Sequence, residues 1–147
     1  MVEKKKILAI GSDHAGYELK TLIIHFLESL GYKVQDYGAF SSLSVDYPDV
    51  AHPLAAAIVN HTHDFGILIC GTGNGVNMAA NKHKGIRSAL CWNKDIAKFA
   101  IEHNNANIIA LPARFIDFIT AKEIIETALF SGFEAGRHQL RVDKINC

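Results

Sequence analysis

Short apolar runs alternate with longer amphipathic segments along the chain. The short runs have the length of buried strands and cover residues 7–10, 33–36, 65–70, 88–91 and 107–111. The segments that follow them space apolar residues three or four positions apart, as helices do, over residues 17–30, 49–60, 76–82, 94–103 and 116–129. This alternation predicts right-handed βαβ units and a parallel sheet with helices on both faces. We therefore expect a Rossmann-like fold, a three-layer α/β/α sandwich with a five-stranded parallel sheet.

Length and charge limit the classes of partner. A chain of 147 residues with 49% hydrophobic content can build one core, so we expect a single domain over residues 1–147. The formal net charge is zero, which removes the electrostatic basis for binding nucleic acid or an anionic membrane. We expect a small-molecule ligand and other protein chains as partners.

Cysteine usage and the first apolar run indicate the compartment. Cys70, Cys91 and Cys147 are odd in number and show no pairing pattern. The apolar run over residues 7–10 is too short for the core of a signal peptide or for a membrane span. We therefore expect a cytoplasmic protein with reduced thiols.

A glycine-rich loop follows the third predicted strand. It begins at the strand-end thiol and leads into a helical segment through Cys70, Gly71, Thr72, Gly73, Asn74 and Gly75. Closely spaced glycines let a ligand approach the backbone, and a helix start favours anions and the thiolate form of cysteine. The loop fits neither the dinucleotide-binding nor the Walker pattern. We predict an active-site loop; the alternative is a buried strand-end cysteine followed by a tight turn.

Polar side chains also follow other predicted strands. Asp13 and His14 follow the first strand, Tyr47 follows the second, and Arg114 follows the fifth. Ligands of open α/β sheets bind outside the carboxyl ends of the strands. With Cys70, these groups suit proton transfer on a small phosphorylated substrate. For Asp13 and His14 the alternative is a helix N-cap and its neighbour.

Two further groups lie later in the chain. Arg137 and Arg141 are four residues apart in a C-terminal tail, 132–147, that we expect to contain one short helix. On one helix face they would form a phosphate clamp, and the alternative is a solvated face. His103 and Asn104 close the fourth predicted helix, where capping is the alternative to catalysis.

A histidine pair, His61 and His63, lies in a polar turn before the third strand. This turn is expected at the end of the sheet opposite the ligand crevice. Elsewhere the sequence has no CxxC or HExxH motif and no carboxylate cluster. We therefore expect no metal cofactor.

The order of strands and helices places His103 and Asn104 far from Cys70. A helix in a parallel sheet returns the chain to the starting edge, so residues that close the fourth helix lie near the amino ends of the strands. If both groups serve one site, they come most simply from different subunits. We therefore predict at least a homodimer, and possibly a tetramer, with shared active sites.

Taken together, these residues resemble the ribose-5-phosphate isomerase B family, within the wider sugar-phosphate isomerases that include galactose-6-phosphate isomerase subunits. The similarity covers nearly the whole chain. It rests on separate motifs in the same order: Gly-Ser-Asp-His-Ala-Gly at 11–16, Asp-Tyr-Pro at 46–48, Ile-Cys-Gly-Thr-Gly at 69–73, Ala-Ala-Asn-Lys at 79–82, Gly-Ile-Arg at 85–87, His-Asn at 103–104 and Gly-Arg-His-Gln-Leu-Arg at 136–141.

The resemblance implies interconversion of D-ribose 5-phosphate and D-ribulose 5-phosphate through an enediolate, a step of the pentose phosphate pathway, with no cofactor. It implies that Cys70 moves the proton between C1 and C2, that His103 opens the furanose ring, and that Thr72 and the loop N–H groups stabilise the enediolate oxygen. The implied binding residues are Asp13, His14, Tyr47 and Asn104 for the sugar hydroxyls, and Arg114, Arg137 and Arg141 for the phosphate.

One position departs from the family pattern. Many relatives have Ser where this chain has Asn77, which bears on hydroxyl contacts and substrate preference. Some relatives replace the cysteine by a carboxylate on the loop, whereas here no Glu or Asp lies between Gly71 and Lys82. The alternatives are an isomerase of a six-carbon sugar phosphate, such as allose or galactose 6-phosphate, and a non-enzymatic sensor of a sugar phosphate.

Overall fold

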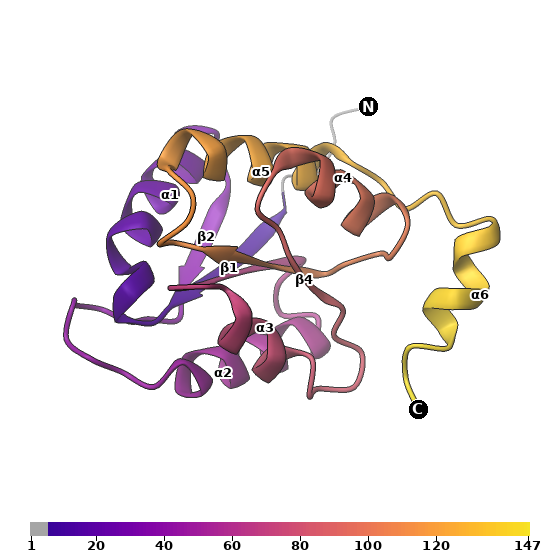
Figure 1. Ribbon diagram of the computed structural model, residues 1–147, viewed down its shortest axis with the longest axis horizontal. Helices are drawn as coiled ribbons and strands as arrows, with labels where there is room; N and C mark the ends of the chain where they lie inside the picture. The colour runs from indigo at the N-terminus through magenta and orange to yellow at the C-terminus, as the bar shows by residue number, and fades with distance from the viewer. Residues whose placement is uncertain (1–5) are drawn as a thin grey trace.

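The computed structural model describes residues 6–147 and contains a five-stranded parallel sheet (Figure 1). Its strands run in the order β2-β1-β3-β5-β4, and each neighbouring pair is parallel. Their bounds are β1 (Ile7–Ser12), β2 (Lys33–Asp36), β3 (Phe65–Cys70), β4 (Ser88–Leu90) and β5 (Ile108–Pro112). The predicted strand positions and the predicted parallel sheet are confirmed.

Helices cover both faces of the sheet, as predicted. They are α1 (Tyr17–Ser29), α2 (Tyr47–Val59), α3 (Asn74–Ala80), α4 (Lys94–Glu102), α5 (Phe118–Phe130) and α6 (Arg137–Asp143), with a 3-10 turn, η1 (His14–Gly16). Figure 1 shows α1, α4 and α5 on one face, α2 and α3 on the other, and α6 at the edge of the sandwich. Within residues 6–147, no helix has the length and apolar character needed to cross a membrane.

The central strand β3 contributes to a hydrophobic core on each face of the sheet. Ile67 and Ile69 belong to the core beneath α1, α4 and α5, whereas Leu68 and Cys70 belong to the core beneath α2 and α3. This is the alternation of side chains that a strand imposes. The Cys70 side chain therefore leaves the sheet on the α2 and α3 face.

Three predicted helix starts are wrong by two residues, each for a local reason. The second helix begins at Tyr47 rather than residue 49, because Pro48 fits the first turn, where its missing N–H costs nothing. The third begins at Asn74 rather than 76, because Gly73 turns the chain with φ 75°. The fifth begins at Phe118 rather than 116, because Asp117 caps it by accepting from the Thr120 N–H at 2.8 Å.

A partly buried ion pair holds the loop between β2 and α2. The Lys20 side chain is 1% exposed, and its Nζ lies 2.7 and 2.9 Å from the two carboxylate oxygens of Asp36. The same ammonium donates to the carbonyl oxygen of Ala39, while Asp36 accepts from the Gly38 N–H at 2.8 Å. This pair joins α1, β2 and the chain that leads to Tyr47.

Candidate active site

The segments that follow β1 and β3 diverge toward opposite faces of the sheet. The Asp13 N–H donates to the Ile69 carbonyl oxygen at 3.2 Å, which holds the ends of the two strands together. The chain after β1 then enters α1 on one face, and the chain after β3 enters α3 on the other. Ligands of open α/β sheets bind at such a switch point.

Glycines in the loop after β3 bring two predicted binding residues close to it. A Cβ on Gly71 would lie 3.1 Å from Arg114 Nη1, and a Cβ on Gly75 would lie 2.6 Å from the Tyr47 ring. The Arg114 N–H also donates to the Gly71 carbonyl oxygen at 3.0 Å. The absence of a side chain at Gly71 and at Gly75 therefore lets a guanidinium and a phenol pack directly on the loop backbone.

The Thr72 hydroxyl is oriented by the same loop. Its Oγ1 accepts from the Asn74 N–H at 3.2 Å. Since the oxygen is used as an acceptor, its hydrogen can donate elsewhere. Thr72 thus has the donor that an oxyanion would require, while the Asn74 N–H is already engaged.

Cys70 lies at the last position of β3 and is 4% exposed. Its carbonyl oxygen accepts from the Ala113 N–H at 2.9 Å, which ties the strand end to the residue after β5. The alternative prediction, a buried cysteine at the end of a strand, is confirmed as far as its position and burial are concerned. The proposed chemistry of its thiol rests on its place at the start of the glycine loop, which carries Thr72 and contacts Arg114.

Asp13 and His14 both make local contacts. Asp13 is the N-cap of η1, and its Oδ1 accepts from the N–H groups of Ala15 at 2.9 Å and Gly16 at 3.3 Å. His14 Nδ1 accepts from the Val45 N–H at 3.3 Å, which defines the tautomer with the proton on Nε2. With Tyr47 they line a cavity of about 470 Å³. The capping alternative for Asp13 is therefore confirmed, and its carboxylate also borders a cavity.

His103 and Asn104 lie at the other end of the sheet. The Asn107 carbonyl oxygen accepts from the N–H of Gly66, near the start of β3, whereas Cys70 pairs with Pro112 at its end. The four-residue separation along β3 corresponds to about 13 Å. Within one chain the structure therefore does not bring His103 to Cys70, in agreement with the placement predicted from the order of strands and helices.

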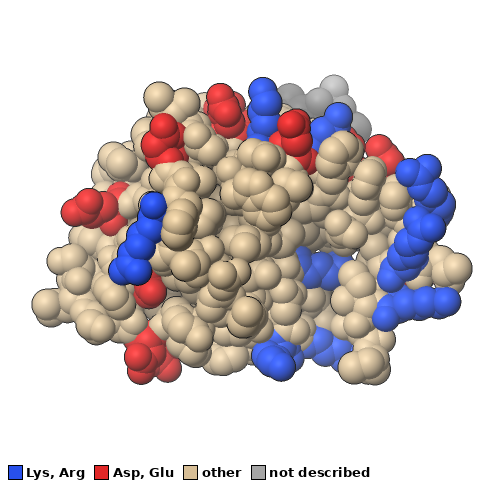
Figure 2. All heavy atoms as spheres, viewed as in Figure 1, with Lys and Arg blue, Asp and Glu red and all other residues tan. Residues whose placement is uncertain are grey.

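The two arginines of the tail lie on α6, the helix whose His138 stacks on His103. Arg137 and Arg141 are exposed on α6, confirming the predicted short helix. Figure 2 shows basic side chains along the edge of the molecule where α6 lies. Asn104 is also exposed and lines a cavity of about 520 Å³ with the last residues of the chain. A second group of predicted site residues thus lies apart from the Cys70 loop.

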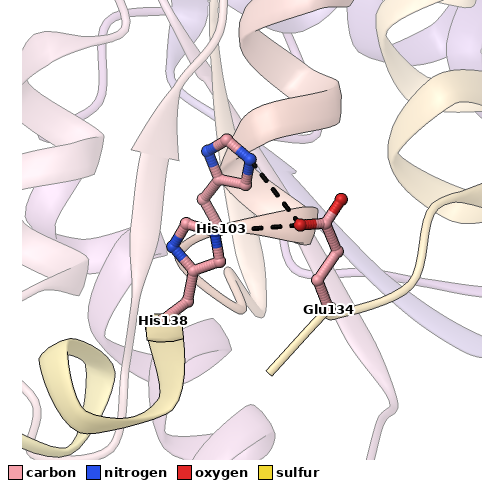
Figure 3. A group of neighbouring side chains, drawn as sticks. All are labelled: His103, Glu134 and His138. Atoms are coloured by element: carbon pink, nitrogen blue, oxygen red, sulfur yellow. Dashed lines mark ion pairs between the residues drawn. The ribbon is translucent and has the colours of Figure 1, made fainter. Parts of the chain in front are cut away.

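His103 forms a three-residue cluster with Glu134 and His138 (Figure 3). The sequence analysis missed this cluster. Glu134 Oε2 lies 3.9 Å from His103 Nε2 and 3.7 Å from His138 Nε2. The two imidazoles stack with centroids 4.2 Å apart and planes at 14°. Desolvation lowers the pKa of His138, with smaller contributions in the same direction from His103 and Arg137. The four-residue spacing of Glu134 and His138 on either side of a helix start was the available signal.

The cluster has the ligand types of a zinc site but not its geometry. The ligand atoms of His103, Glu134 and His138 lie within 4.8 Å of one another. Because the imidazole planes are nearly parallel, the in-plane lone pairs of the two Nε2 atoms do not converge on one point. A zinc ion about 2.1 Å from both nitrogens would require one ring to turn.

A match to known proteins covers almost the whole described chain. The family model for Ribose/Galactose Isomerase matches residues 8–145. The chain belongs to this family. Ribose-5-phosphate isomerase B of Escherichia coli (strain K12) is 41% identical over 140 residues, which cover 95% of this chain and 94% of the relative.

Solved structures of this isomerase family have the same fold. That of a ribose 5-phosphate isomerase from Thermotoga maritima has a TM-score of 0.96 at 46% identity, covering 97% of this chain and 99% of the other. That of ribose-5-phosphate isomerase B from Mycoplasma genitalium, with bound ribulose 5-phosphate, has a TM-score of 0.89 at 43% identity, covering 94% and 92%.

Four positions of this isomerase-family chain that the sequence analysis singled out lie outside the two groups. Burial raises the pKa of Cys91 to about 12, so its thiol stays protonated, whereas Cys147 is exposed. The predicted polar turn before β3 holds His63, whose Nε2 lies 2.9 Å from the Tyr37 hydroxyl. Asn77 Oδ1 is buried without a hydrogen-bond partner among the described residues, at the position that departs from the family pattern.

Proposed function

We propose that the protein interconverts D-ribose 5-phosphate and D-ribulose 5-phosphate. The observation that carries this proposal is the position of the Cys70 thiol, at the end of β3 and beside a glycine loop on which Arg114 and Tyr47 pack. The family match over residues 8–145 and the relative solved with ribulose 5-phosphate support the same substrate. The reaction requires only proton transfers, and we propose that no cofactor or metal takes part.

The first step opens the furanose ring. His103 donates a proton to the ring oxygen, the bond between C1 and that oxygen breaks with its electron pair going to oxygen, and the C1 hydroxyl loses a proton to water. The product is the open aldehyde with a hydroxyl on C4. A histidine suits this role because the ordinary pKa of an imidazole lies near neutral pH.

The second step moves hydrogen between two carbons. The Cys70 thiolate takes the proton from C2, and the electron pair forms an enediolate with negative charge on the C1 oxygen. Thr72 and the loop N–H groups donate to that oxygen, which typically contributes about 2.7 to 4 kcal/mol for one well-placed donor. The C2 hydroxyl proton then passes to the C1 oxygen, and the thiol returns its proton to the C1 carbon as the C2 oxygen becomes the carbonyl, which gives the ketose.

The remaining candidate residues bind the substrate. Asp13, His14, Tyr47 and Asn104 would bind the sugar hydroxyls. Arg114, Arg137 and Arg141 would hold the phosphate, because guanidinium groups bind phosphate oxygens in pairs. Among residues 6–147, the side chains of the two exposed arginines of α6 make no hydrogen bond or ion pair that would account for their spacing on one face.

We also propose that the active site is shared between two subunits. Cys70 and His103 lie at opposite ends of the sheet in one chain, so one chain does not complete the site. A two-fold dimer would place the His103 end of each chain on the Cys70 end of its partner and build two equivalent sites. Large apolar side chains are exposed at both ends, with Phe115 73% exposed near Arg114 and Leu140 63% exposed on α6.

The three free thiols fit a reducing compartment, and we propose the cytoplasm as the site of action. The test of the whole proposal is a coupled assay for ketose formation from ribose 5-phosphate. Turnover supports the proposed function, and faster turnover of allose or galactose 6-phosphate would assign a six-carbon substrate instead. Binding of ribose 5-phosphate without turnover would indicate a sensor and contradict the proposal.

A further inference from the structure

Two other rings pack against the His103 ring. Phe99, one turn earlier on α4, lies with its centroid 4.8 Å away and its plane at 30°. His138 of α6 stacks on the imidazole at 4.2 Å and 14°. Two flat neighbours define the plane in which the His103 nitrogens can move a proton. One of the two belongs to a different element, so the docking of α6 sets this plane.

Glu134 is held at the edge of the same two rings. Its N–H donates to the Glu102 carbonyl oxygen at 3.0 Å, which fixes the segment before α6 to the residue next to His103. Its carboxylate lies 3.9 Å from His103 Nε2 and 3.7 Å from His138 Nε2, as Figure 3 shows. One carboxylate therefore faces two imidazoles.

The charges around the cluster determine which imidazole carries a proton. Two imidazolium ions at this separation would repel each other, so the carboxylate supports one of them at a time. Desolvation is the main cause that lowers the pKa of His138, and His103 and Arg137 add to it. Arg141 acts in the same direction, and Glu134 opposes it. Lys98 and Glu102 of α4 are the other charged groups on the chain next to Phe99 and His103. These causes disfavour the charged form of His138, and the same Glu134 carboxylate faces the His103 ring beside it.

We propose that Glu134 and His138 are positioning residues for ring opening: His138 fixes the plane of the His103 ring, and Glu134 stabilises the protonated ring that donates to the sugar. The inference rests on the proposed function, since it assigns no separate activity. Neither residue needs to touch the substrate. Their effect is confined to the step in which His103 acts and does not extend to the proton transfer at Cys70.

Ribulose 5-phosphate allows the two steps to be measured separately. Its C5 oxygen carries the phosphate and cannot close a ring on C2, so this ketose stays open. Cys70 can therefore remove a C1 proton from bound ribulose 5-phosphate, and deuterium from heavy water enters at C1, without any ring opening. The rate of this exchange therefore depends on substrate binding, on correct folding of the site and on proton transfer by Cys70. It does not depend on ring opening.

The main experiment compares Glu134→Gln with Glu102→Gln. Glu102 is a matched control because it is the neighbouring carboxylate but reaches the cluster only through its backbone. In Glu134→Gln we expect kcat from saturating ribose 5-phosphate to fall about tenfold, because a neighbouring opposite charge typically favours the charged form of a group by about tenfold or more, and this variant removes it. Deuterium exchange into ribulose 5-phosphate should continue at least at the wild-type rate. Glu102→Gln should change neither quantity.

A second pair of variants tests His138. His138→Phe keeps a flat ring against His103, whereas His138→Ala removes it. We expect His138→Phe to retain most of the wild-type kcat and His138→Ala to lose about tenfold in kcat, again with exchange preserved. Equal losses in His138→Phe and His138→Ala would overturn the stacking role.

The outcomes separate this inference from the proposed function. A parallel fall of kcat and exchange in Glu134→Gln would show a general structural role and overturn the inference. A kcat for Glu134→Gln equal to that of Glu102→Gln would also overturn it. If the wild-type protein does not convert ribose 5-phosphate at all, the proposed function itself fails.

Discussion

The two groups of candidate site residues are held by different kinds of contact. At the Cys70 end, backbone hydrogen bonds between strand ends set the positions: Asp13 to Ile69, Ala113 to Cys70, and Arg114 to Gly71. At the His103 end, the main contacts are between side chains of α4 and of the peripheral tail, with one backbone bond from Glu134 to Glu102. The first group can shift only if the sheet changes, whereas the second can shift by local undocking of the tail.

The largest expected effect is at the Cys70 end. Cys70→Ala should lower kcat for isomerisation by about 10³-fold, because the group that transfers the proton is lost, and should leave substrate binding within a small factor. The measurements are ketose formation and calorimetric binding of ribose 5-phosphate. Cys147→Ser, which changes an exposed thiol, is the control and should be fully active. Retention of most of kcat in Cys70→Ala would remove Cys70 from the role of base.

Loss of phosphate contacts should be the next largest effect, and it tests the His103 end. Arg137→Ala or Arg141→Ala should raise KM for ribose 5-phosphate by about tenfold or more, because a charge-assisted contact to phosphate is lost. The weak use of unphosphorylated ribose should hardly change. Equal losses for ribose and ribose 5-phosphate would show that α6 has a structural role instead.

Mixed dimers test whether the two ends meet across subunits. Chains with Cys70→Ala and chains with His103→Ala should each be nearly inactive and should regain activity when unfolded and refolded together. Random pairing makes half of the dimers hybrids with one intact site of two, so activity should approach about a quarter of wild type. Hybrids without activity above the two parents would place both residues in one subunit's site.

A smaller effect is expected from the N-cap of α4, the helix whose C-cap is His103. Asn93 Oδ1 accepts from the Ile96 N–H at 2.9 Å at the start of α4. Asn93→Ala should lower the free energy of unfolding by about 1 kcal/mol, while Asn93→Ser keeps a cap and should cost much less. Urea unfolding measures both. Equal destabilisation by the two substitutions would mean that the cap contact is not the cause.

The smallest expected effect is a pH dependence of stability at the tail. The pKa of His138 is lowered from its ordinary value of 6.5, so the unfolded chain binds a proton there at a higher pH than the folded chain does. The contribution of His138 to stability is therefore lost as pH falls below 6.5. His138→Phe should show a shallower decrease of Tm between pH 7.5 and 5.5 than wild type. Parallel Tm curves would contradict this assignment.

The Cys70 end was predictable from the sequence because its information is local. Hydrophobic periodicity placed each strand within two residues, and topology then put Asp13 and Cys70 at neighbouring strand ends. The helix starts near Pro48 and Gly73 were missed because a single residue decided each of them. The predicted roles of these side chains in catalysis stay predictions.

The contacts between distant elements were not predictable in the same way. Lys20 and Asp36 have ordinary surface-type side chains in the sequence, and only the fold brings them together beneath the loop that leads to Tyr47. Glu134 and His138 were missed because their partner, His103, lies about thirty residues earlier on another helix. Periodicity describes one element at a time and carries no information on such pairs.

The thiol of Cys91 can report how often the edge of the sheet at β4 opens. The side chain is fully buried behind β4, where its N–H donates to the Ala110 carbonyl oxygen at 2.9 Å, and the pKa of its thiol is raised to about 12. An alkylating reagent can reach it only when the edge of the sheet separates or the chain unfolds. In a Cys147→Ser chain, the rate of a second thiol modification after that of Cys70 therefore measures how often this edge opens.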